Sequence, residues 1–140
     1  MKLSTRVRYG CRALLDLALH NDEGPVALEV LAQEEGIPER YLAKIIQDLR
    51  RSGLIRSVRG AGGGYMLNRP PDQVSILDVW EALEGPLCPV ECLADEAACK
   101  METTCVTREV WDELREAMLK VLGSRTLAAL ARRHSVRTPG

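Results

Sequence analysis

The sequence has no run of apolar residues long enough to cross a membrane. Among its 140 residues there is no phenylalanine, and there are only two tryptophans and two histidines. Neither His20 nor His134 belongs to a motif that pairs it with a nucleophile, and no paired-carboxylate or nucleotide-binding signature is present. The opening MKLSTRVRYG lacks the apolar centre of a signal peptide. We therefore expect a cytoplasmic protein that has no membrane segment and is not an enzyme.

The sequence also lacks an overall excess of basic residues, because its formal net charge is -1. A nucleic-acid partner needs lysine and arginine to neutralise its phosphates, so this average argues against one. The charge is unevenly distributed, however. Between Glu39 and Arg69 there are seven basic residues and two acidic ones, a local net charge of +5. A solvated charged helix gives the same pattern, but such a concentration is also typical of a nucleic-acid-binding surface.

The basic window includes the outline of a helix-turn-helix. Apolar spacing predicts a first helix that begins after Ser4 or Thr5 and ends at about His20, with Cys11 on its apolar stripe as a core residue. A short helix ends near Gly36, and a second helix starts after Ile37 and Pro38. The second helix leaves polar residues facing outward, of types that contact bases and phosphates: Arg40, Lys44, Gln47, Arg50 and Arg51.

A β-hairpin is predicted directly after these helices. Residues 54–59 are predicted to form a strand, the glycine-rich residues 60–64 a turn, and residues 65–67 the returning strand. A phosphate-binding loop would need lysine and serine or threonine after the glycines, whereas Tyr65 and Met66 follow them. We interpret the hairpin as a wing, with Arg59 at its tip, where an arginine can enter the minor groove of DNA.

The C-terminal half predicts three further helices. Ser75 and Asp78 form a capping signal for a helix over residues 75–84. Thr107 is expected to cap a long helix that Gly123 closes, followed by a short helix over residues 127–132 and a disordered tail. The long helix has one broad apolar face, formed by Val110, Trp111, Leu114, Ala117, Met118, Val121 and Leu122. This face can fold back as core or pair with its copy, and we favour a homodimer.

Four of the five cysteines fall within eighteen residues, at Cys88, Cys92, Cys99 and Cys105. This segment has few core-forming residues, so it needs a ligand or a docking surface to become ordered. Disulfides persist mainly in secreted proteins, and we therefore favour thiolate ligands. The intervals do not form the two tight pairs of a zinc site, which favours an iron–sulfur cluster over zinc.

Several motifs together resemble the IscR, NsrR and CymR family of bacterial winged-helix transcription regulators. These are KLSTRVRYG, IPERYLAKIIQDLRRSGLI, SVRGAGGGYML and a loop with three cysteines before a long helix, and the resemblance covers roughly residues 1–131. It implies a homodimer with cross-paired long helices, in which cluster occupancy changes operator binding. It also implies that Cys92, Cys99 and Cys105 bind the cluster, that Arg59 is the wing arginine, and that Tyr41 and Lys44 meet DNA.

The sequence departs from this family at the fourth cluster ligand. Arg108 stands where IscR-type members have a histidine, and Arg8 where NsrR-type members have an aspartate. The fourth ligand is therefore unassigned, with Cys88, Glu91, Glu102 or an external thiol as candidates. The cluster type depends on this ligand; a 2Fe–2S cluster is favoured, with a 4Fe–4S cluster as the alternative. LEGPLCPVE is similar to the CymR branch, which lacks the cysteines and senses cysteine supply by binding a partner enzyme.

The sequence thus predicts a mainly α protein with a small β-hairpin, divided into three parts. Residues 1–84 are the expected winged helix-turn-helix domain, 85–106 a cluster-binding loop, and 107–140 the dimerisation helix, a short helix and a tail. The expected function is a repressor that binds operator DNA and senses iron–sulfur status, redox state or nitric oxide. The alternatives are a CymR-like or zinc- or thiol-switch repressor, and an iron–sulfur carrier protein. The residues expected at the DNA interface are Arg40, Tyr41, Lys44, Gln47, Arg50, Arg59, Gly60 and Gly62.

Overall fold

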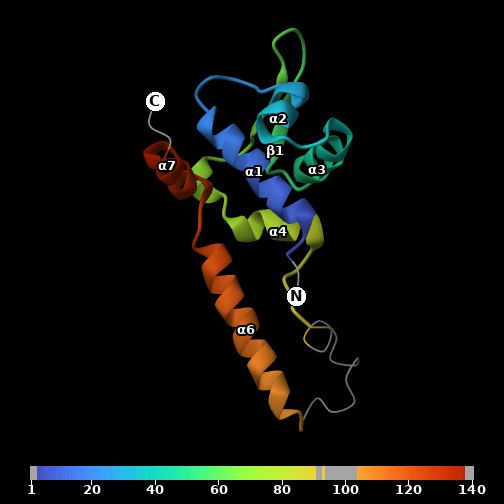
Figure 1. Cartoon of the computed structure of the whole chain (residues 1–140), viewed down its shortest axis with the longest axis vertical. Coiled ribbons are helices and arrows are strands. Elements are labelled where there is room, and N and C mark those ends of the chain that lie inside the picture. Colours follow the sequence, from blue (N-terminus) through green and yellow to red (C-terminus); the bar gives the residue numbers. More distant parts are fainter. Residues whose placement is uncertain (1–2, 91–92, 94–103, 138–140) are drawn as a thin grey trace.

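The computed structural model describes residues 3–90, 93 and 104–137 (Figure 1). The described chain consists mainly of helices with one antiparallel hairpin, as the sequence predicts. The elements are α1 (Thr5–Leu19), α2 (Leu28–Glu35), α3 (Glu39–Arg51), β1 (Ile55–Val58), β2 (Gly64–Leu67), the 3-10 helix η1 (Pro71–Gln73), α4 (Ile76–Glu84), α6 (Val106–Gly123) and α7 (Leu127–Arg137). Sequence reasoning did not predict η1.

Local capping signals explain where the first helices begin and end. The hydroxyl of Ser4 accepts a hydrogen bond from the Val7 backbone N–H at the start of α1. Gly36 ends α2 with a left-handed backbone, φ 64° and ψ 33°, which a glycine adopts without strain. Ser75 and Asp78 form the predicted capping box of α4, each side chain accepting from the other residue's backbone N–H.

One apolar core joins α1, α2, α3, α4, the hairpin and α7. Leu14 of α1, Leu31 of α2 and Leu42 of α3 are completely buried in it. The predicted inward residues of α3 are all buried: Leu42, Ile45, Ile46 and Leu49. Because this buried stripe fixes the rotation of α3, the opposite, polar side of the helix must face outward.

The hairpin pairs Ile55 with Leu67 and Val58 with Gly64, close to the predicted strands. The backbone of Val26 extends this pairing, because it exchanges two hydrogen bonds with Tyr65, at 3.0 and 2.8 Å. The connection between α1 and α2 therefore holds strand β2 of the wing close to its turn.

Helix α6 projects away from the rest of the chain, and α7 returns to it (Figure 1). The prediction that Thr107 caps the long helix is wrong, because α6 starts at Val106 with Cys105 in the cap position. The helix includes Gly123, and Ser124 is its C-cap. Among the described helices, none is both long and apolar enough to cross a membrane.

The predicted short helix and disordered tail need a second correction. Helix α7 continues to Arg137, so His134 lies in a helix rather than in a tail. Leu127 is completely buried in the common core, and its backbone N–H donates to the Val74 carbonyl at 2.9 Å. This long-range packing against α1 and η1 stabilises α7, and local sequence signals do not contain it.

Candidate nucleic-acid interface and cysteine segment

The outer side of α3 presents a row of exposed polar residues. Arg40, Lys44 and Gln47 recur at helical spacing on this side, followed by Arg51, while Arg50 is also exposed. These positions agree with the outward orientation predicted from the sequence. Guanidinium, ammonium and amide groups in such a row can donate hydrogen bonds to phosphates and base edges of a nucleic acid.

Tyr41 has a different environment from its neighbours on α3. Its side chain is half-buried and packs against the core. The ring meets that of Tyr9 edge-on, with centroids 5.7 Å apart and an interplanar angle of 79°. Tyr41 therefore helps to fix α3 against α1, and its expected contact with DNA stays a prediction.

The wing places an arginine next to a tight glycine turn. Arg59 follows β1 directly and is exposed, as are Gly60 and Gly62. Gly60 and Gly62 have φ values of 100° and 76°, a region that side chains other than glycine rarely adopt. The Gly63 backbone N–H donates to the Gly60 carbonyl at 3.0 Å and closes the turn. The wing can therefore present the Arg59 side chain beyond the end of the sheet.

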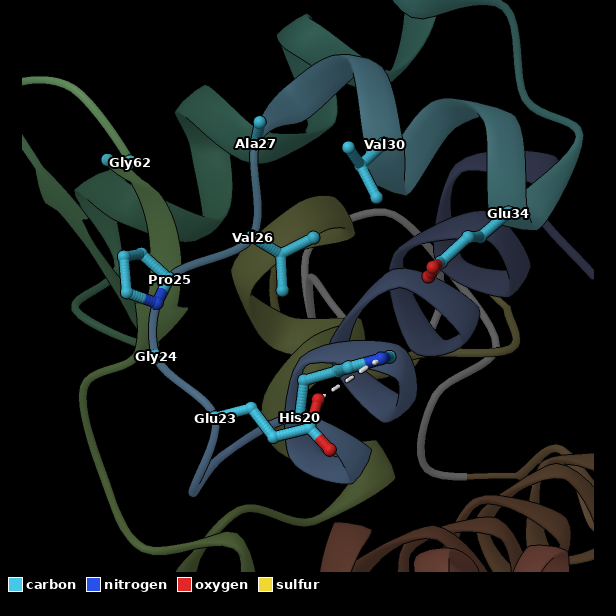
Figure 2. Close-up of a pocket in the computed structure, with 10 residues that line it drawn as sticks. His20, Glu23, Gly24, Pro25, Val26, Ala27, Val30, Glu34 and Gly62 are labelled. Atoms are coloured by element: carbon cyan, nitrogen blue, oxygen red, sulfur yellow. Dashed lines mark ion pairs between the residues drawn. The ribbon is translucent and has the colours of Figure 1, made fainter. Parts of the chain in front are cut away.

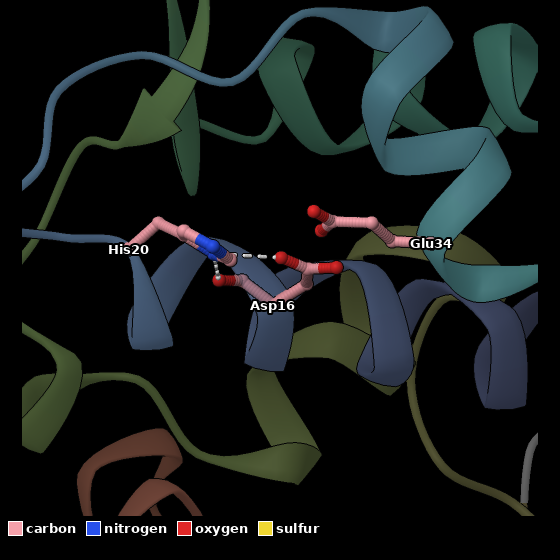
Figure 3. A group of neighbouring side chains, drawn as sticks. All are labelled: Asp16, His20 and Glu34. Atoms are coloured by element: carbon pink, nitrogen blue, oxygen red, sulfur yellow. Dashed lines mark hydrogen bonds and ion pairs between the residues drawn. The ribbon is translucent and has the colours of Figure 1, made fainter. Parts of the chain in front are cut away.

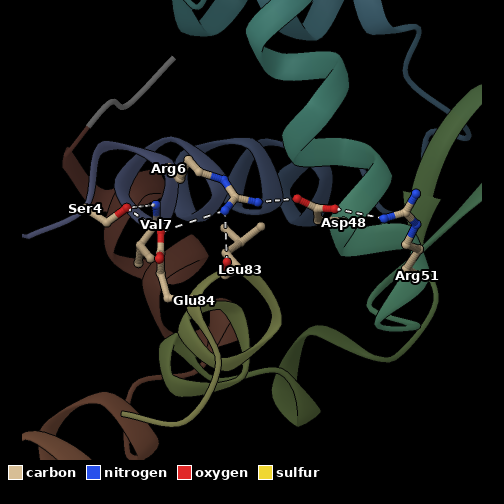
Figure 4. A network of polar contacts seen from close by, with 7 residues as sticks. All are labelled: Ser4, Arg6, Val7, Asp48, Arg51, Leu83 and Glu84. Carbon is tan, nitrogen blue, oxygen red and sulfur yellow. Dashed lines mark hydrogen bonds and ion pairs between the residues drawn. The ribbon is translucent and has the colours of Figure 1, made fainter. Parts of the chain in front are cut away.

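An ion-pair network that sequence reasoning missed connects α3 with α1 and α4 (Figure 4). The Arg6 guanidinium contacts the Asp48 carboxylate and donates a hydrogen bond to the Leu83 carbonyl at 3.0 Å. Asp48 also lies 3.6 Å from the guanidinium of Arg51. The acidic Asp48 within a basic helix was a signal for an ion pair. The sequence did not reveal its partner, because Arg6 lies on α1, 42 positions away. The network holds the outward face of α3 at a fixed angle to α1.

Two cysteines of the cysteine segment are described, and two are not. Cys92 and Cys99 lie outside the described residues. Cys88 and Cys105 are both free thiols, and the Cys88 thiol donates to the Val90 carbonyl at 2.9 Å. The sulfur of Cys105 lies 3.2 Å from the hydroxyl oxygen of Thr107, and this hydrogen bond, with that of the Arg108 backbone, lowers the pKa of Cys105. Hydrogen bonds of this kind favour a thiolate, the form that binds metals.

The environment of Cys11 differs from that of Cys105, and Cys11 packs in the core as predicted. Its side chain packs against the core beside a cavity of about 400 Å³, which Val7 and Trp80 also line. Burial raises the pKa of Cys11 to about 11, so the thiol stays protonated near neutral pH. A protonated thiol is a poor metal ligand.

The apolar face of α6 remains largely exposed in the single chain. No side chain of α6, whose residues are all described, is buried. Val110 is 53% exposed, Leu114 37% and Val121 54%, and these residues recur along one side of the helix. Isolated exposed apolar residues are common, but a continuous apolar stripe is typical of an interaction surface.

Comparisons with known proteins relate this architecture to transcription regulators. Protein rrf2 of Nitratidesulfovibrio vulgaris is 45% identical over 132 residues, covering 94% of this chain and 88% of that protein. The HTH-type transcriptional regulator CymR of Bacillus subtilis is 43% identical over 131 residues, covering 94% and 90%. Both likenesses cover the helix-turn-helix, the wing and the long helix.

Two solved structures have the same fold over nearly the whole chain. The structure of CymR, the global cysteine regulator of B. subtilis, superposes with a TM-score of 0.81 at 40% identity and covers 95% of this chain and 98% of that one. The structure of T. potens IscR superposes with a TM-score of 0.84 at 36% identity and covers 100% and 93%. The Rrf2 family model, described as iron-dependent transcriptional regulator, matches residues 3–133. This chain therefore belongs to the Rrf2 family of winged-helix transcriptional regulators.

Proposed function

We propose that this protein is a homodimeric repressor that binds operator DNA and holds an iron–sulfur cluster through Cys92, Cys99 and Cys105. The cluster would report iron–sulfur status, redox state or nitric oxide to the DNA-binding surface. The observation that carries the DNA-binding part is the exposed polar row of α3 beside the Arg59 wing, both fixed to one core. Membership of a family of DNA-binding transcriptional regulators supports it.

The described thiols have the chemistry that a cluster requires. Cluster iron is bound by cysteine thiolates, and Cys105 is a free thiol with hydrogen-bonding neighbours. Cys105 immediately precedes α6, so its position depends on the orientation of that helix. A bound cluster would supply a redox-active and oxygen-sensitive centre at the thiolates. Cys88 is a candidate fourth ligand, since its thiol is free as well.

Helix α6 would connect the cluster-binding segment with the DNA-binding surface. Its exposed stripe, Val110, Leu114 and Val121, can pair with the same stripe of a second copy. A dimer would set the distance between two copies of α3, and winged regulators read two half-sites in this way. An altered Cys105 segment would shift the start of α6 and hence favour one arrangement of the two DNA-binding units.

Anaerobic purification tests the cluster directly. We expect a coloured protein with sulfur-to-iron charge-transfer absorption and measurable iron and sulfide. Replacing Cys92, Cys99 and Cys105 with serine should abolish the colour and the iron, whereas Cys11→Ser, which changes a thiol of the core, should retain both. Equal colour and iron content in the triple serine variant would show that these are not the ligands.

The colour, metal content and operator binding of the same anaerobic preparation distinguish the alternative functions. The similarity to CymR of B. subtilis favours a cysteine-responsive repressor as the second candidate, and that candidate predicts a colourless protein without sulfide that still binds an operator. Stoichiometric zinc without sulfide would indicate a zinc or thiol switch. An iron–sulfur carrier would hold a cluster but bind every promoter fragment equally, at a stated salt concentration.

A further inference from the structure

A second group of possible ligands lies near the turn of the wing and contains no cysteine. Asp16 lies in the last turn of α1 and His20 is the C-cap of that helix, and Glu34 faces them from the last turn of α2 (Figure 3). One ligand atom from each of these three side chains lies within 4.8 Å of the others. Among the described residues, these three side chains form a group that could hold a metal ion.

The Asp16 carboxylate is unusual because it is buried and incompletely bonded. The Asp16 side chain is 5% exposed. His20 Nδ1 lies 2.9 Å from both the Asp16 backbone carbonyl oxygen and Asp16 Oδ1, but Oδ1 has no partner with hydrogen-bond geometry. A buried carboxylate oxygen without a donor is destabilising unless a cation or a donor completes it. This oxygen points into the space between His20 and Glu34 (Figure 3).

The negative charge at this site exceeds what its neighbours offset. The Glu34 carboxylate lies beside that of Asp16, so two carboxylates share the one imidazole of His20. Glu23 adds a further carboxylate, with Oε2 3.8 Å from His20 Nε2 (Figure 2). The nearby Glu35 is already paired, since its Oε2 lies 3.1 Å from Arg12 Nε. The imidazole of His20 is therefore the cationic group closest to the Asp16 carboxylate.

Space for an ion and its water molecules is present beside these residues. A cavity of about 330 Å³ is lined by His20, Glu23 and Glu34 on one side and by Gly62 and Gly63 of the wing turn on the other (Figure 2). A three-ligand site normally keeps open positions for water, and this cavity provides them. The cavity also touches Val26, whose backbone holds the wing through Tyr65.

We propose that Asp16, His20 and Glu34 form a binding site for a divalent first-row transition ion such as Mn²⁺ or Fe²⁺. Two carboxylates and one imidazole are ligands that suit these ions, whereas thiolates suit softer centres. The ion completes the coordination of the buried Asp16 oxygen and cross-links α1 to α2. Because the α1–α2 connection carries Val26, which pairs with Tyr65, the bound ion restrains strand β2 of the wing close to its turn. The site is independent of the proposed cluster, since it shares no residue with the cysteine segment.

Titration of the full chain with Mn²⁺, followed by the electron paramagnetic resonance signal of the free ion, tests the site. We expect saturable binding of one Mn²⁺ per chain and a higher melting temperature with the ion bound. Glu34→Gln and His20→Gln should each weaken binding by about 10-fold or more. Glu34 is exposed, so its substitution leaves the core intact. Glu29→Gln is the matched control, because Glu29 is exposed on the same helix but outside the group, and it should bind Mn²⁺ as the native chain does.

The triple serine variant of Cys92, Cys99 and Cys105 separates this proposal from the cluster. It should lose the cluster and keep the Mn²⁺ affinity of the native chain. The proposal is overturned if Mn²⁺ does not bind saturably, or if Glu34→Gln and His20→Gln bind it with unchanged affinity. Loss of Mn²⁺ binding in the triple serine variant would also overturn it, because the ion would then occupy the cysteine segment.

Discussion

At the scale of single residues, the wing depends on a close approach between two backbones. A Cβ atom built on Gly64 would lie 2.3 Å from the Val26 carbonyl oxygen, and Gly64 has φ 155°. The neighbouring Gly62 has φ 76°, but a Cβ atom there would meet nothing within 4 Å. Both glycines have a backbone conformation that other residues rarely adopt, and Gly64 is required in addition by close packing against Val26.

We expect Gly64→Ala to destabilise the protein more than Gly62→Ala does. The added methyl group at residue 64 must displace the Val26 backbone, which should lower the free energy of unfolding by about 1–3 kcal/mol. At residue 62 only the left-handed conformation is penalised, by about 1 kcal/mol. Chemical denaturation of both variants measures the difference. Equal losses would show that the contact between Gly64 and Val26 does not restrain the wing.

A second prediction at this scale concerns the reactivity of Cys11. The thiolate is the form that reacts with alkylating reagents, and burial raises the pKa of Cys11 from 9.0 to about 11. At a pH near 8, alkylation of Cys11 should be about 100-fold slower in the folded chain than in the chain unfolded by denaturant. Mass spectrometry of the Cys11 peptide over time gives both rates. Similar rates would mean that this thiol is not protected by the core.

At the scale of elements, α3 separates the residues that fix it from those that can bind. Leu42, Ile45, Ile46 and Leu49 are buried on one side, and Asp48 contacts Arg6 of α1. Lys44 is exposed on the other side. An exposed lysine contributes little to folding, so its substitution can report on binding alone.

Lys44→Ala should weaken operator binding without changing the melting temperature. If Lys44 neutralises a phosphate, the slope of log affinity against log salt falls by about 1. Fluorescence anisotropy with the promoter fragment upstream of its own gene, at several salt concentrations, measures that slope. Arg132→Ala is the control, because Arg132 is exposed on α7, which lies on the other side of α1 from α3 (Figure 1). A normal slope for Lys44→Ala would remove this residue from the interface.

The sequence predicted these elements well for a local reason. The spacing of apolar residues and the caps at Ser4, Gly36 and Ser75 depend on neighbours within a few positions, so they are visible in the chain itself. The end of α7 was predicted too early. That helix is stabilised by Leu127 and by packing against α1, which are long-range contacts. Whether the three-part division at residues 84 and 106 describes independent units stays a prediction.

At the scale of the whole molecule, α6 determines how two copies would meet. The helix projects from the core with Val110, Leu114 and Val121 exposed (Figure 1). A fully buried leucine contributes about 1.5–3 kcal/mol relative to an exposed one, and a two-fold interface buries each position twice. Burial of the apolar stripe of α6 in a two-fold interface would therefore stabilise a dimer.

Leu114→Glu should convert the proposed dimer into a monomer, because it would place a charge in the middle of the paired α6 helices. Sedimentation equilibrium measures the change, and operator affinity should fall with it. Glu116→Gln is the control, since Glu116 is exposed on the opposite side of α6, and it should remain dimeric. A dimeric Leu114→Glu variant would place the interface elsewhere.

The sequence by itself determined the helix-turn-helix, the glycine turn of the wing and the outward row of Arg40, Lys44 and Gln47, because periodicity and turn chemistry act over a few residues. It also placed the cysteines close together along the chain. Only the tertiary structure decided that Arg6 meets Asp48 and that Asp16 and His20 face Glu34. Those contacts join side chains on different helices, and they form when the core packs α1 against α2 and α3.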